Sequence, residues 1–282
     1  MKIENVSDTA RWVAVYRAME SERPDAIFHD PYARRLAGEH GEKIVAAMKR
    51  GRSAAWPMIV RTAVFDEVIA ARIAAGAEVV VNLAAGLDAR PWRMKLPPNL
   101  RWIDVDLPGI LNYKTEMMRD VAPHCHYEAV TLDLTDAAAR AALFARIGAE
   151  AKNALVVSEG LLIYLQAHEV SRLAEALAAE PAFKYWLTDL ASSRLLKMMS
   201  RMWGKSVAAS APFLFGPEEG TAFFEPSGWR EKEWHSMGDD SKRLNRQMRG
   251  AWLWRLIGSF GGKKRQEGWR RFSGAVLLER AP

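Results

Sequence analysis

The stretch that decides the fold is residues 79–88, which have the sequence VVVNLAAGLD. A continuous apolar run rich in β-branched residues is typical of a strand that is buried on both faces. We place this strand at Glu78–Leu83, between Gly76 and Gly86. The small residues that follow it allow a ligand to approach the backbone closely. The sequence therefore predicts a buried strand that leads into a ligand-binding loop.

Further strand-sized segments follow the first and alternate with helical stretches. Helices are expected at Thr135–Ile147 and His168–Ala179, for example. Short apolar strands separated by helices predict a mostly parallel, doubly wound α/β sheet covered on both faces. Ligands of such sheets bind at the carboxyl ends of the strands. The further strands are expected at Arg101–Val105, Tyr127–Leu132, Ala154–Ser158 and Tyr185–Leu190.

The segment before the first strand is predicted to be helical. Helices are expected at Thr9–Ala18, Glu42–Met48 and Ile59–Ala75, where the residue pattern favours them. Asp30-Pro31 marks a break between helices. Pro31 suits the first position of the helix that follows, because a helix does not need the N–H that proline lacks at that position.

We expect a single domain with four parts. They are a helical N-terminal lid region (1–75), a ligand-binding core (76–191), an insertion after the fifth strand (192–270) and a final core strand (271–282). The insertion is less regular and rich in Met, Phe and Trp. It either covers the substrate or forms an ordinary packed subdomain.

Acidic residues end the second, third and fourth predicted strands. They are Asp106, Asp133 and Glu159. Asp106 follows the small-residue loop at about the spacing at which an acid accepts hydrogen bonds from ribose hydroxyls in nucleotide-binding folds. The loop has neither the triphosphate-binding nor the pyrophosphate-binding glycine motif. An edge rich in carboxylates would repel phosphates and suits a cationic ligand that contains ribose, and S-adenosylmethionine (SAM) is such a ligand.

A set of motifs along the chain carries a family resemblance. The motifs are Ser7–Ala10, Asp30–Ala33, Arg61, Asn82–Arg90, Asp104–Pro108 with Lys114, Asp133-Leu134, Glu159–Leu165, and Gly228-Trp229 after Phe223-Phe224. With them the chain resembles the leucine carboxyl methyltransferase family, which includes bacterial O-methyltransferases of polyketide pathways. The resemblance implies a SAM-dependent methyltransferase with a Rossmann-like core that uses no metal.

The resemblance also implies contacts with the methionine part of SAM. Arg61 would bind the carboxylate, and Glu159 would lie near the amino end. The backbone of Ala84 and the turn at Gly86 would pass close to the methionine moiety. Arg11 aligns with a basic N-terminal position of the family. All of these are expected cofactor-binding residues.

Contacts with the adenosine part are implied in the same way. Asp106 would hold the ribose hydroxyls, and Asp133 and Leu134 would flank the adenine. The chain departs from the family at Ala84, where glycine is usual, and at Ala89, where threonine is usual. Because alanine disfavours a positive φ, cofactor binding is expected to be unimpaired if Ala84 has a negative φ. Weaker SAM affinity is expected otherwise.

The methyl acceptor is less well defined by the sequence. Tyr164 is a candidate on the substrate side, whereas His29 and His235 are expected to be structural or surface residues. The expected acceptor is a carboxylate, a phenolic oxygen or a hydroxyl oxygen of a small molecule. With no outstanding general base, the sequence favours a carboxylate or an acidic phenol among these. Two alternatives stay open: methylation of a protein's C-terminal carboxylate, and a SAM-binding protein without catalysis.

Composition limits the partners and the compartment. The chain has 282 residues, a net charge of +6 and a pI of about 9.5, but basic and acidic residues are interspersed almost everywhere. No basic stripe with interleaved aromatic residues suggests nucleic acid, and no apolar run approaches the ~20 residues that span a bilayer. With Cys125 as its single cysteine and no secretory signal, the chain is expected to be a cytoplasmic enzyme acting on a small molecule.

Overall fold

A seven-stranded sheet forms the centre of the computed structural model, which describes residues 6–48, 55–203, 212–248 and 263–281. The strand order is β3-β2-β1-β4-β5-β7-β6. Strands β1 to β5 are parallel, and β7 runs antiparallel between β5 and β6. The predicted doubly wound α/β fold is therefore confirmed. The strands are β1 (Val79–Leu83), β2 (Arg101–Asp106), β3 (His126–Thr131), β4 (Ala154–Ser158), β5 (Phe183–Ala191), β6 (Trp229–Ser236) and β7 (Ser273–Arg280).

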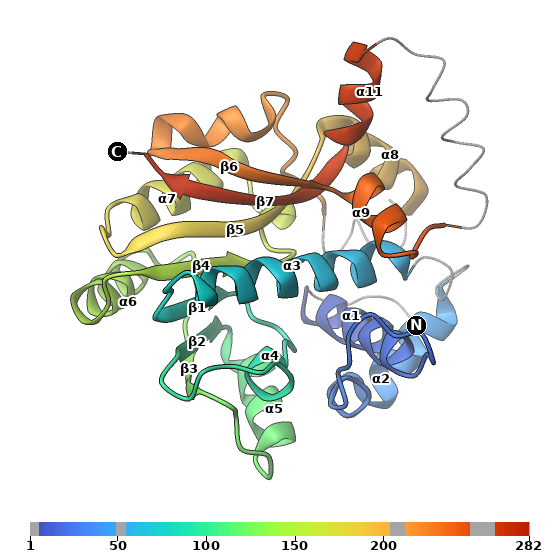
Figure 1. The fold of residues 1–282 in the computed structure, drawn as a ribbon, viewed down its shortest axis with the longest axis horizontal. Coiled ribbons are helices and arrows are strands. Elements are labelled where there is room, and N and C mark those ends of the chain that lie inside the picture. Colours follow the sequence, from blue (N-terminus) through green and yellow to red (C-terminus); the bar gives the residue numbers. More distant parts are fainter. Residues whose placement is uncertain (1–5, 49–54, 204–211, 249–262, 282) are drawn as a thin grey trace.

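Helices cover the sheet and extend beyond it at the N-terminus (Figure 1). Within the described parts of the chain, none of them is long and apolar enough to cross a membrane. The longer helices are α1 (Val6–Ser21), α2 (Ala33–Ala47), α3 (Trp56–Ala74), α5 (Pro108–Met118), α6 (Ala137–Glu150), α7 (Ala167–Ala178) and α8 (Ser193–Trp203). Shorter ones are α4 (Arg90–Arg93), η2 (Leu162–Tyr164), η3 (Gly220–Ser227), α9 (Met237–Arg243) and α11 (Lys263–Arg270).

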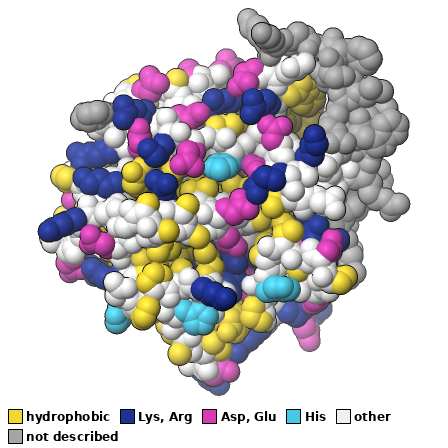
Figure 2. Space-filling model, viewed as in Figure 1, with side chains coloured by type: hydrophobic (Ala, Val, Ile, Leu, Met, Phe, Trp, Pro, Cys, Tyr) yellow, Lys and Arg dark blue, Asp and Glu magenta, His cyan; other side chains and the backbone are white. Residues whose placement is uncertain are grey.

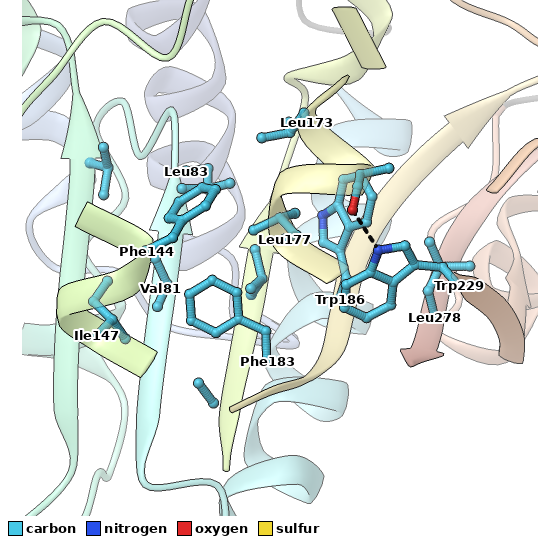
Figure 3. Close-up of a cluster of buried hydrophobic side chains, with 14 of the residues drawn as sticks. Val81, Leu83, Phe144, Ile147, Leu173, Leu177, Phe183, Trp186, Trp229 and Leu278 are labelled. Atoms are coloured by element: carbon cyan, nitrogen blue, oxygen red, sulfur yellow. Dashed lines mark hydrogen bonds between the residues drawn. The ribbon is translucent and has the colours of Figure 1, made fainter. Parts of the chain in front are cut away.

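Strand β1 is buried on both faces, as its apolar sequence predicts. Successive side chains point to opposite faces of a sheet. Val81 accordingly joins a core with Phe144 of α6, whereas Val80 joins a second core with Phe65 of α3. Figure 3 shows the first of these cores, which continues along the sheet to Trp186 of β5. Burial of β1 on both sides fixes the direction in which its C-terminal loop leaves the sheet.

Strand β6 lies in the segment that the sequence predicts to be irregular, and that expectation is wrong here. Its sequence, WREKEWHS, lacks an apolar alternation because β6 is at the edge of the sheet and pairs only with β7 among the described strands. Charged residues are typical of edge strands. Arg230 and Lys232 both contact Glu279 of β7, each at 2.8 Å. Such cross-strand pairs replace the apolar pattern that marks a central strand.

The break at Asp30-Pro31 exists, but Pro31 does not open the next helix. Helix α2 begins at Ala33, and Pro31 lies in the preceding turn. The buried carboxylate of Asp30 explains the turn, because it accepts the N–H of Tyr32 at 3.1 Å and the guanidinium of Arg17 at 2.8 Å. These contacts hold the turn against α1. In Figure 1, α1 and α2 pack together beside the sheet.

Candidate cofactor and substrate site

A cavity of about 520 Å³ lies at the carboxyl ends of the parallel strands. Its volume is in the range of about 300–1,000 Å³ that small-molecule sites have. The loops after β1 to β4, the end of β5, and helices α1 and α3 all contribute to its wall. Eight of the predicted site residues line it together: Arg61, Ala84, Gly86, Asp106, Asp133, Leu134, Glu159 and Tyr164.

Arg11 is not among the residues that line this cavity. Its guanidinium carbon lies 3.9 Å from the ring centre of Tyr113, and its Nη1 donates to the carbonyl of Ala37 at 3.4 Å. These contacts join α1 to α2 and α5. In this structure Arg11 is thus a link between helices.

The loop after β1 has a left-handed backbone at two positions. Ala84 and Gly86 both have a φ of +52°. A negative φ at Ala84 is therefore not observed. A side chain makes this conformation unfavourable by about 1–3 kcal/mol, whereas Gly86 adopts it without strain. At Gly86 an added Cβ would lie 3.2 Å from the Cβ of Ala10, so the absence of a side chain also allows α1 to approach.

Asp106 ties this loop to the end of β2. Its carboxylate accepts the N–H of Gly86 at 2.6 Å and the N–H of Leu107 at 2.7 Å. Burial raises the pKa of Asp106, and the two backbone hydrogen bonds oppose that rise. Each carboxylate oxygen can accept a further hydrogen bond. Asp106 can therefore order the loop and still accept hydroxyl groups from a ligand.

Asp133 and Leu134 form the opposite wall after β3. The Asp133 carboxylate accepts the N–H of Thr135 at 2.9 Å and its hydroxyl at 2.7 Å. The backbone hydrogen bond from Thr135 is the main cause of the lowered pKa of Asp133. Asp133 is thus held as an anion at the rim of the cavity.

Arg61 projects from α3 between the ends of β4 and β5. Its Nε donates to Glu159 at 3.0 Å, and its Nη1 donates to Asp189 at 3.0 Å. The coulombic attraction of these carboxylates raises the pKa of Arg61 above its ordinary value, against the effect of burial. Two donors of the guanidinium are engaged here, and an arginine has five. The remaining donors can bind an anionic ligand group.

Three cavity residues of this network were not assigned roles from the sequence: Asp88, Arg90 and Asp189. Arg90 is buried and contacts Asp88 and Asp66 at 2.7 Å and Glu159 at 2.9 Å. Burial alone would raise the pKa of Asp88, but Arg90 and three further cations lower it to about 2. Asp189 lies near the end of β5 and so continues the series of acids at strand ends. This position is the sequence feature from which its place in the cavity can be predicted.

Tyr164 lies on the side of the cavity formed by η2 and α1. Its ring is 5.9 Å from that of Phe213, and the two are tilted by 36°. Burial raises the pKa of the Tyr164 phenol, while a hydrogen bond with Thr9 and the charge of Arg61 oppose the rise. Tyr164 is therefore a neutral hydroxyl at physiological pH, next to an apolar part of the wall.

The charges around the cavity suit SAM. Five carboxylates and three guanidinium groups line it, although the chain as a whole carries a net charge of +6. The local excess of negative charge favours a cationic ligand. Carboxylate acceptors for ribose and ammonium groups and an arginine for a carboxylate are all present. These residues thus match the adenosyl, amino-acid and sulfonium groups of SAM.

Two solved structures have a similar fold. A DUF574 family protein from Streptomyces avermitilis has a TM-score of 0.58 at 11% identity, with 96% of this chain and 97% of that chain covered. The magnesium protoporphyrin IX methyltransferase from Synechocystis, solved with bound S-adenosylhomocysteine, has a TM-score of 0.52 at 11% identity over 85% and 93%. At this identity the likeness concerns the fold, which is the class I methyltransferase fold.

The sequence comparisons give the family. The profile of the leucine carboxyl methyltransferase family matches residues 10–178. A Streptomyces coelicolor protein named as a SAM-dependent methyltransferase is 30% identical over 253 residues, which cover 85% of this chain and 88% of that protein. A Saccharopolyspora erythraea protein with a name of the same kind is 31% identical over 250 residues, or 81% and 84% of the two chains. The chain belongs to the leucine carboxyl methyltransferase family and is a SAM-dependent methyltransferase.

Proposed function

We propose that this methyltransferase methylates an ionised oxygen of a small molecule, a carboxylate in the first place and an acidic phenol in the second. The observation that carries the proposal is the composition of the cavity wall. Among the described residues that form it, there is no histidine, lysine or cysteine to act as a general base. Glu159 and Asp189 are held by guanidinium groups, and Tyr164 is a neutral phenol. A carboxylate needs no base, whereas an alcohol does.

SAM would bind with the carboxylate of its amino-acid part at Arg61, its ribose at Asp106 and its adenine beside Asp133 and Leu134. When bound, it supplies a methyl group made electrophilic by the sulfonium. The contribution of the chain is to position the acceptor in line with that group and to exclude water. The loop after β1 and helix α1 lie close together and both line the cavity, so they can exclude water from it.

An apolar part of the wall supports the choice of a carboxylate. It is formed by side chains from α1, α3, η2 and the segment that contains Phe213. When a carboxylate oxygen displaces the sulfide from the methyl group of the sulfonium, opposite charges neutralise each other, and surroundings of low dielectric constant favour such a step. The residues concerned include Trp12, Val13, Met58, Ile163 and Phe213.

A small acceptor is favoured over a macromolecule. The cavity of about 520 Å³ has to hold SAM as well as the acceptor. Figure 2 shows basic and acidic side chains interspersed on one face of the molecule, without a broad basic stripe. Binding of nucleic acid relies on clustered basic residues that contact phosphates. We therefore propose a small-molecule substrate and neither nucleic acid nor a membrane surface as partner.

The proposal is tested with SAM labelled in its methyl group and a panel of acceptors in matched sets. Each set contains a carboxylic acid, a phenol and an alcohol with the same carbon skeleton. Methyl esters release volatile methanol in mild base, whereas methyl ethers do not. If the acceptor is a carboxylate, we expect the acids to give methylated products whose label is released in mild base. If it is a phenol, we expect base-stable label on the acidic phenols only. Base-stable label from simple alcohols would contradict the proposal.

A further outcome distinguishes the protein alternative. Base-labile label on a peptide with a free C-terminus, and on none of the small acids, would show a protein carboxyl methyltransferase instead.

A further inference from the structure

Asp189 occupies a position in the cavity to which the sequence assigned no role. Ser158 of β4 pairs with Thr188 of β5, so Glu159 and Asp189 follow at the same level on neighbouring strands. Both carboxylates contact Arg61, each at 3.0 Å. The arginine therefore lies between two acids that face the same cavity.

The two acids differ in how far their charge is neutralised. Glu159 contacts guanidinium groups through both oxygens: Oε1 lies 3.0 Å from Arg61 and Oε2 lies 2.9 Å from Arg90. Asp189 contacts one guanidinium, that of Arg61, and its other oxygen accepts the backbone N–H of Gly160 at 2.6 Å. Its side chain is also more exposed, at 20% compared with 14% for Glu159. Asp189 thus keeps more negative charge toward the cavity, since an N–H neutralises less charge than a second guanidinium.

Gly160 allows this arrangement. It has a φ of +71°, and an added Cβ would lie 3.3 Å from both terminal nitrogens of Arg61. Without a side chain at this position, the guanidinium can lie directly over the loop. An arginine and a carboxylate 3.0 Å apart are then presented side by side.

We propose that Asp189 binds the α-ammonium group of the amino-acid part of SAM, while the adjacent Arg61 binds its carboxylate. The ammonium and carboxylate of an amino acid are neighbours, and so are these two side chains, with opposite charges. The family resemblance places Glu159 near the amino end, but both of its oxygens are already paired with arginines. Glu159 then acts as a positioning residue that orients Arg61. This inference rests on the placement of SAM in the cavity and is independent of the methyl acceptor.

Binding measurements with three ligands test the inference without any turnover. S-adenosylhomocysteine has both groups, its analogue without the amino group keeps only the carboxylate, and 5′-methylthioadenosine has neither. The variants are Asp189→Asn, which keeps an oxygen for Gly160, and Glu159→Gln. Asp120→Asn is the matched control, since Asp120 is exposed and pairs with Arg35 outside the cavity.

We expect Asp189→Asn to weaken S-adenosylhomocysteine about tenfold, which is typical of a lost charge-assisted contact. The deaminated analogue should lose clearly less affinity than S-adenosylhomocysteine, although Asp189 also contacts Arg61, and the affinity for 5′-methylthioadenosine should stay within about twofold of the wild type. Glu159→Gln should weaken S-adenosylhomocysteine and the deaminated analogue equally, because it acts on both through Arg61. Asp120→Asn should change none of the three affinities.

Equal losses for S-adenosylhomocysteine and the deaminated analogue in Asp189→Asn would overturn the proposal, because Asp189 would then act through Arg61 or the fold. An amino-specific loss in Glu159→Gln but not in Asp189→Asn would assign the ammonium to Glu159 instead. If Asp189→Asn does not fold, the wild type tests the ammonium contact, and an equal response of S-adenosylhomocysteine and the deaminated analogue to Glu159→Gln assigns it to Asp189. The wild type should bind S-adenosylhomocysteine about tenfold more tightly than the deaminated analogue, and equal affinities would refute an ammonium contact. Failure to find a methyl acceptor affects none of these results.

Discussion

At the residue scale, the most informative position is Ala84, where the chain departs from its family. The backbone there has a φ of +52°, which is the conformation that glycine adopts without strain. The fold keeps the loop geometry although the residue has changed. Hydrogen bonds at both ends of the loop provide the restraint: Ala85 donates to Val105 at 3.2 Å, and Gly86 donates to Asp106 at 2.6 Å.

Ala84→Gly should therefore stabilise the protein by about 1 kcal/mol, because relief of the left-handed strain exceeds the extra freedom of glycine in the unfolded chain. SAM affinity should stay the same or increase. Ala85→Gly is the matched control, since Ala85 has no positive φ, and it should destabilise. Urea unfolding measures both changes. A loss of stability or of SAM affinity in Ala84→Gly would mean that the loop is built around alanine.

Asp106→Ala should weaken SAM at least tenfold, because hydrogen bonds to a charged group are worth about 1.5–3 kcal/mol each. The variant should weaken 5′-methylthioadenosine by a similar factor, since both ligands contain the ribose. Calorimetric titration with the two ligands makes the comparison, and thermal melting monitors the loop that Asp106 holds. Unchanged affinities would remove Asp106 from the ribose site.

At the scale of elements, α1 has two roles. One face packs in a buried cluster with α2, to which Val15 and Tyr16 contribute. The other face lines the cavity with Thr9, Ala10 and Val13. Because the buried face is part of a core, α1 is more than a cover over the site. We propose that its cavity face selects the substrate.

Val13→Phe tests this role of α1. The larger side chain should fill acceptor space and lower kcat/KM at least tenfold, which a loss of about 1.4 kcal/mol in transition-state binding produces. The affinity for S-adenosylhomocysteine should change by less than about twofold. Steady-state kinetics and calorimetry on the same preparation provide both values. An equal loss in both would place Val13 at the cofactor.

A buried ion pair joins the segment after α9 to the C-terminal part of α1. Arg246 donates to the fully buried carboxylate of Glu20 at 2.7 Å and 3.0 Å, across 226 residues of sequence. Removal of Arg246 leaves the buried Glu20 carboxylate with a more distant cation, Arg23 at 3.7 Å, which compensates its charge less well. Arg246→Ala should therefore lower the free energy of unfolding by about 3–5 kcal/mol. Glu20→Gln in the same background should restore part of it, as urea unfolding would show. A loss below about 1 kcal/mol would contradict a stabilising role for the buried ion pair between Arg246 and Glu20.

At the scale of the whole molecule, the sheet gathers residues that are far apart in the chain. Arg61, Asp106 and Asp189 come from three separate parts of the sequence, and the parallel register brings them to one cavity. The sequence predicted this edge because each central strand is apolar and ends in a loop or an acid. Asp189 lies near the end of the fifth strand, so the same pattern applied to that strand also predicts Asp189 as a site residue.

Other features could not be predicted because they depend on long-range pairing. Strand β6 has no apolar pattern, since its side chains pair with β7 at the edge of the sheet. The contacts of Arg90 join residues from α3, the loop after β4 and its own loop, and only the folded chain shows that they meet. The position of Arg11 depended on how α1 packs against α5, which spacing along the chain does not determine.

The placement of SAM in the cavity is tested by a calorimetric titration of Arg61→Ala with SAM and with 5′-methylthioadenosine, which lacks the amino-acid part. If the cavity binds SAM with its carboxylate at Arg61, the variant should lose at least tenfold in affinity for SAM, because a charge-assisted contact is removed. Its affinity for 5′-methylthioadenosine should remain within about twofold of the wild type. Equal losses for the two ligands, or undiminished binding of SAM, would contradict the placement of the cofactor.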